Sequence, residues 1–416
     1  MKFGGALMGN AQGIRNVANL IEEFSCEPLV VVVSAIGKTT NALEKICEKI
    51  ESGEVLENDF FSVKQQHLQI INELFPNGHD ELAESLSSIF DKLWDAIIEK
   101  YPNRYEAYDN IVSFGEELSS CLNYYYLSSC GVKIRQISAK CLISTDSNYT
   151  DASVNWEYTG KTISSRVIPA FNSGEVIITQ GFIGCDSLGK TTTLGREGSD
   201  FTAAIFGNLL DADEVTIWKN VPGLMNADPS RFDNAIKIDN ISYYEAIELA
   251  YYGASVIHPK TIQPLKAKNI PLYVRPYYDT SAAPTSITDD TTNDNKVSSI
   301  IVVDDQTLLS IGTKNLDFIG EENLKQIFEV FSRNKVHINL MQNSAVSFSV
   351  CFNQDSIKLE AIIKDLKEYR LKYNTGLKLI TVRHYKDELV DNLIGDNKVY
   401  LVQKSRATVQ VLVKEK

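Results

Sequence analysis

The sequence predicts an α/β protein, in which a mainly parallel sheet has helices on both faces and small α+β modules follow it. Residues 29–34 (LVVVVS) form a continuous apolar run rich in β-branched side chains, which is typical of a strand buried on both faces of a parallel sheet. Strand and helix patterns then alternate along the chain, as in doubly wound domains. From residue 299 the pattern changes to shorter units, which indicates a separate α+β region.

The first region opens with an amphipathic helix predicted over 11–24, where Ile14, Val17 and Ile21 recur at helical spacing. Three long polar–apolar periodic stretches follow, at 39–52, 57–100 and 104–128. We expect further strands at 133–138, 175–180, 214–218 and 271–274, and further helices at 200–210, 242–253 and 259–268.

A change of composition separates the two regions. Residues 279–298 contain almost no large apolar side chain, which is typical of a linker or an edge loop. Beyond it, the strands SSIIVV, TLLSIGT, HINLMQ and SFSVCF and two helices near 321–334 and 356–371 predict a βαββαβ module. We therefore expect one domain over 1–288 and a second region over 299–416, divided into a module at 299–372 and a shortened module at 373–416.

The composition excludes several classes of function. The 416 residues include 41 Lys and Arg against 54 Asp and Glu, a net charge of −13, which argues against sequence-independent binding to nucleic acid. No apolar run is long enough for a membrane span, and the first residues lack a signal-peptide pattern. Seven scattered cysteines without a CxxC motif predict free thiols in a reducing compartment, so we expect a cytoplasmic protein.

Three glycine-containing loops are candidate phosphate sites. Residues 2–5 (KFGG) place a lysine beside two glycines whose amides can approach a phosphate. Residues 191–200 (TTTLGREGSD) open into a predicted helix, whose first N–H groups lack partners and suit an anion. Residues 218–230 follow a predicted strand, at the end where open α/β sheets bind ligands. Taken singly, each loop also has a purely structural interpretation. The first could be a tight turn, the second a helix cap and the third a plain connection.

Together with SAIGKTTN (34–41) and SFGEELSS (113–120), these loops form a series of motifs along the chain. The series KFGGAL, SAIGKTTN, SFGEELSS, TTLGREGSDFTAA, WKNVPGLMNADPS and ELAYYGASVIHPK resembles, in order, the motifs of the aspartate kinase family. The resemblance covers roughly residues 1–290 and implies an amino-acid-kinase-type fold. Residues 307–353 are the clearest part of a further resemblance to the family's ACT regulatory region.

The resemblance implies that the chain transfers the γ-phosphate of ATP to the side-chain carboxylate of L-aspartate, the first step towards lysine, threonine and methionine. The acceptor is already an anion near neutral pH, so the site needs positioning and charge screening more than a general base. Magnesium is expected to enter with ATP, bound mainly by phosphate oxygens and water. In the family, the ACT region binds an end product such as lysine or threonine at a dimer interface, so a homodimer is expected.

The family's site residues map onto matching positions of this sequence. The resemblance gives catalytic roles to Lys2, Arg196 and Asp200. For aspartate it implies contacts from Ser34, Thr40, Glu116, Arg196 and Ser199. For the nucleotide it implies contacts from Lys2, Gly4, Gly5, Lys219, Asn220, Met225, Arg231 and Lys260. For an effector it implies contacts from Gly320, Gln342 and Asn343, although this region could serve only as a dimerisation sheet.

The chain also departs from the family pattern. Ala6 and Leu7 stand where Thr-Ser is usual, Glu197 replaces a glycine, Lys219 and Asn220 replace Thr-Asp, Ser230 replaces an arginine and Ser255 a lysine. These changes leave two alternatives open: a catalytically silent amino-acid sensor, and an amino-acid kinase with a different acceptor. Because both expected substrates are anions, we expect the loops to concentrate positive charge from Lys2, Lys38, Arg196, Lys219 and Lys260 at one site within an acidic protein.

Overall fold

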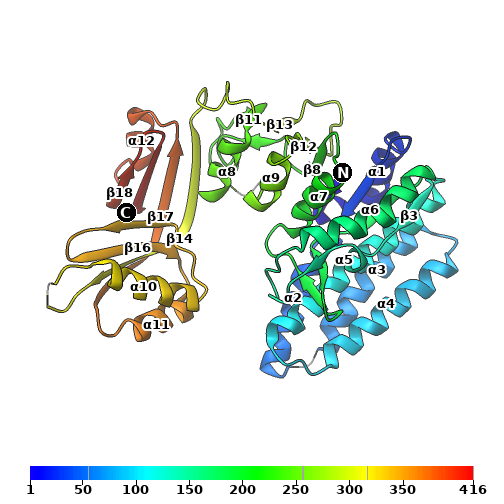
Figure 1. Cartoon of the computed structure of the whole chain (residues 1–416), viewed down its shortest axis with the longest axis horizontal. Coiled ribbons are helices and arrows are strands. Elements are labelled where there is room, and N and C mark those ends of the chain that lie inside the picture. The colour runs from blue at the N-terminus through cyan, green and yellow to red at the C-terminus, as the bar shows by residue number, and fades with distance from the viewer. Residues whose placement is uncertain (55, 255–256, 316, 416) are drawn as a thin grey trace. The chain divides into compact units, whose positions relative to one another are not determined.

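The structure is a computed structural model that describes residues 1–54, 56–254, 257–315 and 317–415 (Figure 1). The chain forms two compact units. The first unit comprises residues 1–224, 237–247 and 256–291, and the second comprises residues 225–236, 248–255 and 292–416. Each unit therefore contains more than one segment of the chain, and each is described separately below.

The first unit is built on an eight-stranded sheet with the order β11-β13-β12-β8-β1-β2-β5-β3. Its strands are β1 (Lys2–Phe3), β2 (Val30–Val33), β3 (Ile134–Gln136), β5 (Val176–Gln180), β8 (Val215–Lys219), β11 (Asn240–Ser242), β12 (Leu272–Pro276) and β13 (Thr285–Thr288). The strands from β12 to β3 are parallel, whereas β13 is antiparallel to β12. The short strand β1 lies in the middle, where Lys2 is in register with Val32 and Ile217.

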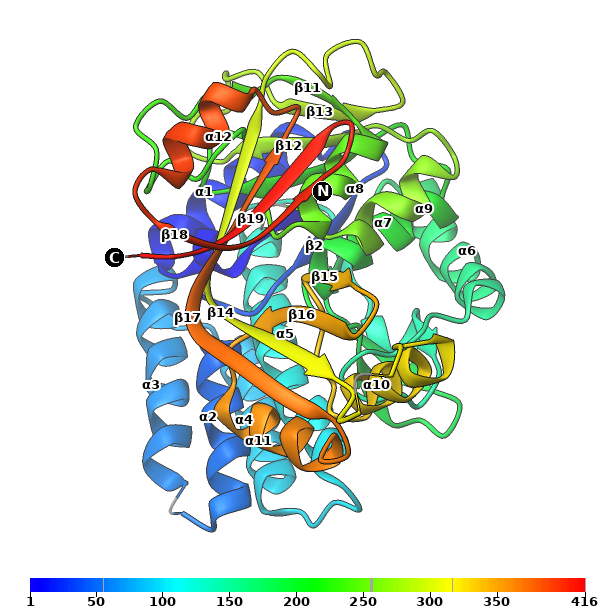
Figure 2. The same ribbon diagram turned by 90° about the vertical axis from the view of Figure 1, so that its left-hand side faces the viewer.

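Helices cover this sheet, and α2 to α5 form a bundle beside it (Figures 1 and 2). The helices are α1 (Ala11–Glu23), α2 (Thr39–Ser52), α3 (Glu57–Leu74), α4 (Asp80–Ile98), α5 (Arg104–Ser129), α6 (Trp156–Asn172), α7 (Gly198–Leu209) and α9 (Pro259–Lys266), together with α8 (Tyr243–Tyr251), whose residues from Glu248 on are assigned to the second unit. Gly5–Met8 and Ala139–Cys141 add two 3₁₀ turns. The core is apolar and includes Val31, Val33 and Ile178 of the sheet, and Phe3 stacks on Trp218 at 6.1 Å between ring centroids.

Short strands form two further small sheets. A three-stranded sheet contains β4 (Ser144–Thr145), β6 (Ile183–Asp186) and β7 (Thr191–Thr193). The strands β9 (Leu224–Met225) and β10 (Lys237–Ile238) form a two-stranded sheet. None of the helices in the described ranges is both long and apolar enough to cross a membrane.

The second unit is centred on a six-stranded antiparallel sheet with the order β15-β16-β14-β17-β19-β18. Its strands are β14 (Ser299–Gly312), β15 (Leu340–Asn343), β16 (Ser347–Asn353), β17 (Arg370–Arg383), β18 (Lys398–Lys404) and β19 (Thr408–Lys414). Its helices are α10 (Glu321–Arg333), α11 (Ser356–Asp365) and α12 (Asp387–Ile394). Helices α10 and α11 lie beside one half of the long strands β14 and β17, and α12 lies beside the other half (Figure 2).

The fold class is confirmed: a largely parallel sheet with helices is followed by an antiparallel α+β region. Several expected elements differ in their limits. The periodic stretch at 57–100 is two helices, because Pro76 and Gly78 (φ 79°) form a turn and His79 caps α4. The expected linker at 279–298 contains β13, which pairs with β12. The helix expected over 356–371 ends at Asp365, because β17 begins at Arg370.

Candidate active site

A cavity of about 550 Å³ lies in the first unit, at the carboxyl ends of β1, β2 and β8. Helices α2, α5 and α7 complete its wall. Eight residues expected from the sequence line it: Lys2, Ser34, Thr40, Glu116, Arg196, Ser199, Asp200 and Lys219. The parallel sheet explains this gathering, because the carboxyl ends of its strands meet at the same edge.

The turn after β1 brings the first strand close to the loop after β2. A Cβ on Gly5 would lie 2.1 Å from the carbonyl oxygen of Ala35, so only glycine fits there. The Gly5 carbonyl also accepts a hydrogen bond from the Gly37 amide at 2.9 Å. Gly4 is less crowded, and a Cβ there would lie 3.7 Å from Lys2 Nζ. Gly5 therefore fixes the turn, whereas Gly4 leaves space beside the lysine.

Asp200 joins two lysines in the wall of the cavity. Its Oδ1 lies 2.5 Å from Lys2 Nζ, and its Oδ2 lies 3.0 Å from Lys219 Nζ. Burial raises the pKa of the Asp200 carboxyl, but the charges and hydrogen bonds of the two lysines outweigh burial and leave the pKa below its ordinary value. The carboxylate is therefore ionised and holds two ammonium groups, an arrangement that suits an anionic ligand such as a phosphate.

Glu116 is a second buried carboxyl group in the cavity wall. It lies near the middle of α5 with 3% of its surface exposed, and its Oε2 has no hydrogen-bond partner among the described residues. Burial raises the pKa of Glu116 to about 8, opposed by a hydrogen bond from the Ala35 amide and by the charge of Lys2. A buried, unpaired carboxyl oxygen facing a polar cavity is suited to an ammonium group of a ligand.

The loop before α7 and the first turn of that helix contribute lining side chains, among them Arg196, Glu197 and Ser199. Glu197 occupies the N-cap position in the left-handed region (φ 55°, ψ 28°), and Ser199 lies in the first helical turn. Arg196 is exposed, so its guanidinium can approach a ligand from the solvent side. The amides of this first turn lack helical partners and add favourable sites for anions.

Asp109, which sequence reasoning missed, joins α5 to β7 and to the turn at Thr150. Its carboxylate accepts hydrogen bonds from the Thr193 amide (2.8 Å), the Thr193 hydroxyl (2.7 Å) and the Thr150 amide (3.0 Å). Burial raises the pKa of Asp109 despite these bonds. Tyr108, beside it on α5, lines the cavity and donates a hydrogen bond to Glu44 at 2.7 Å. A single Asp or Tyr inside a helical pattern gives no motif that could have identified either residue.

The remaining residues expected at the nucleotide lie elsewhere. Asn220 is exposed and does not line the cavity, and Lys38 is likewise exposed outside it. Lys260 forms an ion pair with Asp151 and lines a different cavity, beside Trp156 and Phe201. Positive charge at the described cavity therefore comes from Lys2, Arg196 and Lys219.

Met225 and Arg231 belong to the second unit, where Arg231 forms ion pairs with Asp228 and Asp304. Ser230 bonds to Asp228 through its hydroxyl at 2.6 Å. Of the other departures, Leu7 is buried in the core and Ala6 is exposed. Ser255 lies outside the described residues.

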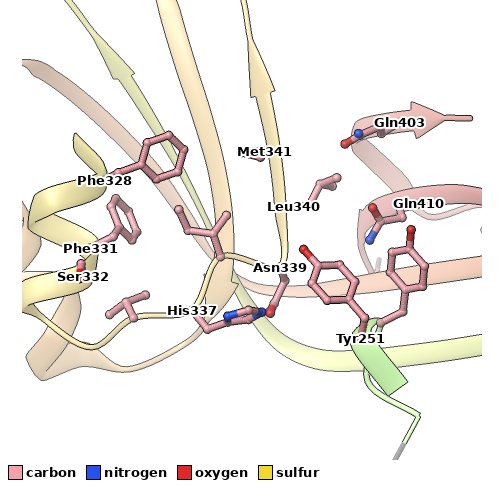
Figure 3. Close-up of a pocket in the computed structure, with 13 residues that line it drawn as sticks. Tyr251, Phe328, Phe331, Ser332, His337, Asn339, Leu340, Met341, Gln403 and Gln410 are labelled. Carbon is pink, nitrogen blue, oxygen red and sulfur yellow. The ribbon is translucent and has the colours of Figure 1, made fainter. Parts of the chain in front are cut away.

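A second cavity of about 550 Å³ lies in the second unit (Figure 3). Tyr251 and His337 meet edge to face at 6.2 Å at one side, and Phe328 lies at the other. The expected effector residues are not among those that line it. Gly320 precedes α10, and Gln342 and Asn343 are exposed on β15, an edge strand of the sheet.

Comparisons with known proteins match residues 1–276 to the amino acid kinase family. Aspartokinase 1, chloroplastic, of Arabidopsis thaliana is 30% identical over 406 residues, which cover 95% of this chain and 70% of that protein. The lysine-sensitive aspartokinase 3 of Escherichia coli (strain K12) is 28% identical over 391 residues, covering 92% and 86% of the two chains. A crystal structure of E. coli aspartokinase III with aspartate and ADP has a TM-score of 0.85 and 24% identity, over 99% of this chain and 95% of that one.

The chain therefore belongs to the amino acid kinase family. The two relatives named above are aspartokinases, and their similarity extends over both units of the chain. The resemblance inferred from the six motifs is thereby confirmed.

Proposed function

We propose that this chain is an active aspartate kinase, which transfers the γ-phosphate of ATP to the side-chain carboxylate of L-aspartate. The proposal rests on one observation above others. A single cavity combines two lysines held by Asp200 with the buried carboxyl group of Glu116, whose Oε2 has no hydrogen-bond partner among the described residues. The two lysine ammonium groups suit the phosphates of ATP, and the Glu116 carboxyl group suits the α-ammonium group of aspartate. The cavity therefore offers partners to both substrates. The aspartokinase relatives support the same assignment.

At the phosphate end, the chain's own residues supply positive charge in a place that Asp200 defines. Lys2 is 7% exposed, so its ammonium group acts with little screening by water. In our proposal, Lys2 contacts the phosphoryl group during transfer and stabilises the charge on its oxygens. Lys219 contacts the nucleotide phosphates from the end of β8.

At the aspartate end, Glu116 accepts the α-ammonium group and Arg196 pairs with the α-carboxylate. Ser34, Thr40 and Ser199 donate hydrogen bonds that orient the substrate. The side-chain carboxylate of aspartate is then left to face Lys2 and the phosphate. It is ionised at neutral pH, so these residues need only orient it and screen its repulsion from ATP.

Magnesium fits the site as an ion carried by ATP. The described residues contain no group of three or more His, Cys, Asp or Glu that could hold a metal ion by themselves, and both oxygens of Asp200 face lysines. We therefore propose that phosphate oxygens and water supply most ligands of the ion. When bound, Mg²⁺ neutralises part of the phosphate charge.

The acceptor can be tested by measuring ADP release with Mg-ATP and either L-aspartate or L-glutamate. We expect kcat/KM to be at least about 100-fold higher for aspartate, because one extra methylene moves the reacting carboxylate away from Lys2 while the α-groups stay bound. A preference for glutamate would contradict the proposed acceptor. Heat of binding with L-lysine but none with aspartate or Mg-ADP would instead support the silent amino-acid sensor.

We further propose that the second unit binds lysine or threonine at an interface between two copies of the chain. The exposed edge strand β15, with Gln342 and Asn343, can pair with a second copy, and Gly320 lies at the start of α10 in the same unit. Sedimentation equilibrium and thermal shift test this. We expect a dimer whose melting temperature rises with lysine or threonine, and a loss of that response in Gln342→Ala. A monomer without either response would contradict the proposal.

A further inference from the structure

Glu197 lines the cavity and has no role in the proposed function. It occupies the left-handed backbone region (φ 55°), which glycine adopts without strain and a side chain adopts at a cost. Its Oε2 is buried and has no hydrogen-bond partner among the described residues. A carboxylate in this position also places negative charge where an anionic substrate must pass. Backbone strain of this kind persists where the surrounding structure enforces it, and it is enriched at functional sites.

The charges around Glu197 suggest that function. Lys2 and Lys219 each approach one oxygen of Asp200, so one carboxylate serves two ammonium groups. Glu197 adds a further carboxyl group to the cavity wall that Lys2, Lys219 and Asp200 line. Burial raises the pKa of Glu197, and the charge of Lys219 is the largest influence that opposes burial. Arg196 and Lys2 oppose it more weakly, and Asp200 adds to it.

Glu197 and Lys219 are also the two departures from the family pattern that lie in this cavity. They are 22 positions apart in the sequence, in different loops, yet they carry opposite charges beside the same aspartate. A lysine added alone would leave excess positive charge, and a glutamate added alone would repel phosphate. Each charge is therefore accounted for by the presence of the other.

We propose that Glu197 is a positioning residue for Lys219: it balances the charge of this second lysine and holds its ammonium group towards the nucleotide phosphates. The inference rests on the proposed function, since it assigns Lys219 to the phosphates of Mg-ATP. The two residues then act as a unit, and neither acts normally without the other.

The variants Glu197→Gln, Lys219→Met and their combination test this unit, because both substitutions remove charge and preserve length. We expect Lys219→Met to lower kcat/KM for Mg-ATP about 100-fold, since it leaves an unbalanced carboxylate facing the phosphates. Glu197→Gln should lower it about 10-fold, mainly through KM for Mg-ATP, with KM for aspartate unchanged. In the Lys219→Met background, Glu197→Gln should instead raise kcat/KM about 10-fold.

This reversal of sign is the decisive result. If Glu197→Gln raises kcat/KM in both backgrounds, Glu197 only repels phosphate and the proposal is wrong. If the two effects simply multiply, the residues are independent and the proposal is equally wrong. The exposed pair Glu157 and Lys161 on α6, 2.6 Å apart, provides a matched control. Glu157→Gln, Lys161→Met and their combination should leave both KM values unchanged.

Binding of Mg-ADP by calorimetry separates this inference from the proposed function. The same reversal should appear in the Kd for Mg-ADP, which requires no phosphoryl transfer. If the wild type makes no aspartyl phosphate but shows the reversal in Kd, the function fails and the pair stands. If it makes the product without the reversal, the pair fails and the function stands. Circular dichroism of every variant verifies folding. Glu197→Gly and Lys219→Thr, singly and combined, repeat the test with a second pair of substitutions.

Discussion

Glu116 couples the stability of the protein to pH. Its pKa is raised from 4.5 in the exposed state to about 8 by burial, so between these values the folded chain holds a proton that the unfolded chain has released. The stability contributed by this proton is fully present below pH 4.5 and is lost as pH rises through about 8. Each pKa unit corresponds to about 1.4 kcal/mol, so the loss amounts to several kcal/mol.

Glu116→Gln, which cannot ionise, should therefore gain stability relative to the wild type as pH rises from about 5 to about 9. Thermal unfolding of both proteins across this range measures the gain. Glu117→Gln is the matched control, because Glu117 is the next residue of α5 and pairs with Lys140 at 2.6 Å. A stability difference between Glu116→Gln and wild type that does not change with pH would contradict the assignment.

Substrate binding by Glu116 gives a second prediction for the same variant. If Glu116 accepts the α-ammonium group, the positive charge of the ligand lowers the pKa of Glu116 and favours the carboxylate in the complex. Glu116→Gln should then raise KM for aspartate about 10- to 100-fold, the effect of losing one charged hydrogen bond. KM for Mg-ATP should change less than about twofold, since the phosphates bind at the Asp200 end. Steady-state kinetics with each substrate varied separately makes the comparison. An equal rise in both KM values would indicate general damage to the cavity.

At the scale of secondary-structure elements, the turn after β1 requires glycine at position 5 but not at position 4. A Cβ at Gly5 would lie 2.1 Å from the Ala35 carbonyl oxygen, so Gly5→Ala must displace β1 or the loop after β2. We expect it to lower stability by about 2–4 kcal/mol and to reduce activity at least 10-fold. Gly4→Ala, with φ −77° and its nearest atom at 3.7 Å, should keep wild-type stability within about 0.5 kcal/mol. Urea unfolding distinguishes the two, and equal stability of both variants would contradict this prediction.

The contact of α5 with β7 depends on Asp109. Asp109→Ala leaves the buried amide and hydroxyl of Thr193 and the partly buried amide of Thr150 without their acceptor, which should cost about 3 kcal/mol and raise KM for aspartate. Asn103→Ala, which removes only the N-cap of the same helix, should cost about 1 kcal/mol and leave KM unchanged. Urea unfolding and kinetics of both variants measure these effects. A normal KM for aspartate in Asp109→Ala would show that this residue does not position the site.

At the scale of the whole molecule, the two units do not follow chain order. Residues 248–255 belong to the second unit, where Glu248 forms a 3.1 Å ion pair with the buried Arg383 of β17. Glu248→Gln removes the negative charge that is paired with Arg383 and should destabilise the second unit by about 1–3 kcal/mol. Differential scanning calorimetry should show a lower transition temperature for the unfolding of that unit. An unchanged profile would contradict it.

The sequence predicts well which residues come together at the site, because its motifs lie at strand ends and parallel strands bring those ends together. It does not predict Asp109 or Tyr108, whose positions in α5 have no distinguishing pattern. The continuous strand β14 is also hidden, because Asp304 and Asp305 interrupt its apolar pattern and a register shift near Gln306 accommodates them. The membership of 225–236 and 248–255 in the second unit depends on contacts distant in sequence, which local patterns do not encode.

The most direct test of the proposed function traps its product. Wild-type protein with Mg-ATP, L-aspartate and hydroxylamine should form aspartyl hydroxamate, because aspartyl phosphate is an acyl phosphate that hydroxylamine attacks. Lys2→Met, which removes the ammonium group 2.5 Å from Asp200, should lower the rate of formation at least about 100-fold while leaving the fold intact. Absence of hydroxamate above background in the wild type, or an equal rate in Lys2→Met, would contradict the assignment of this cavity as an aspartate kinase site.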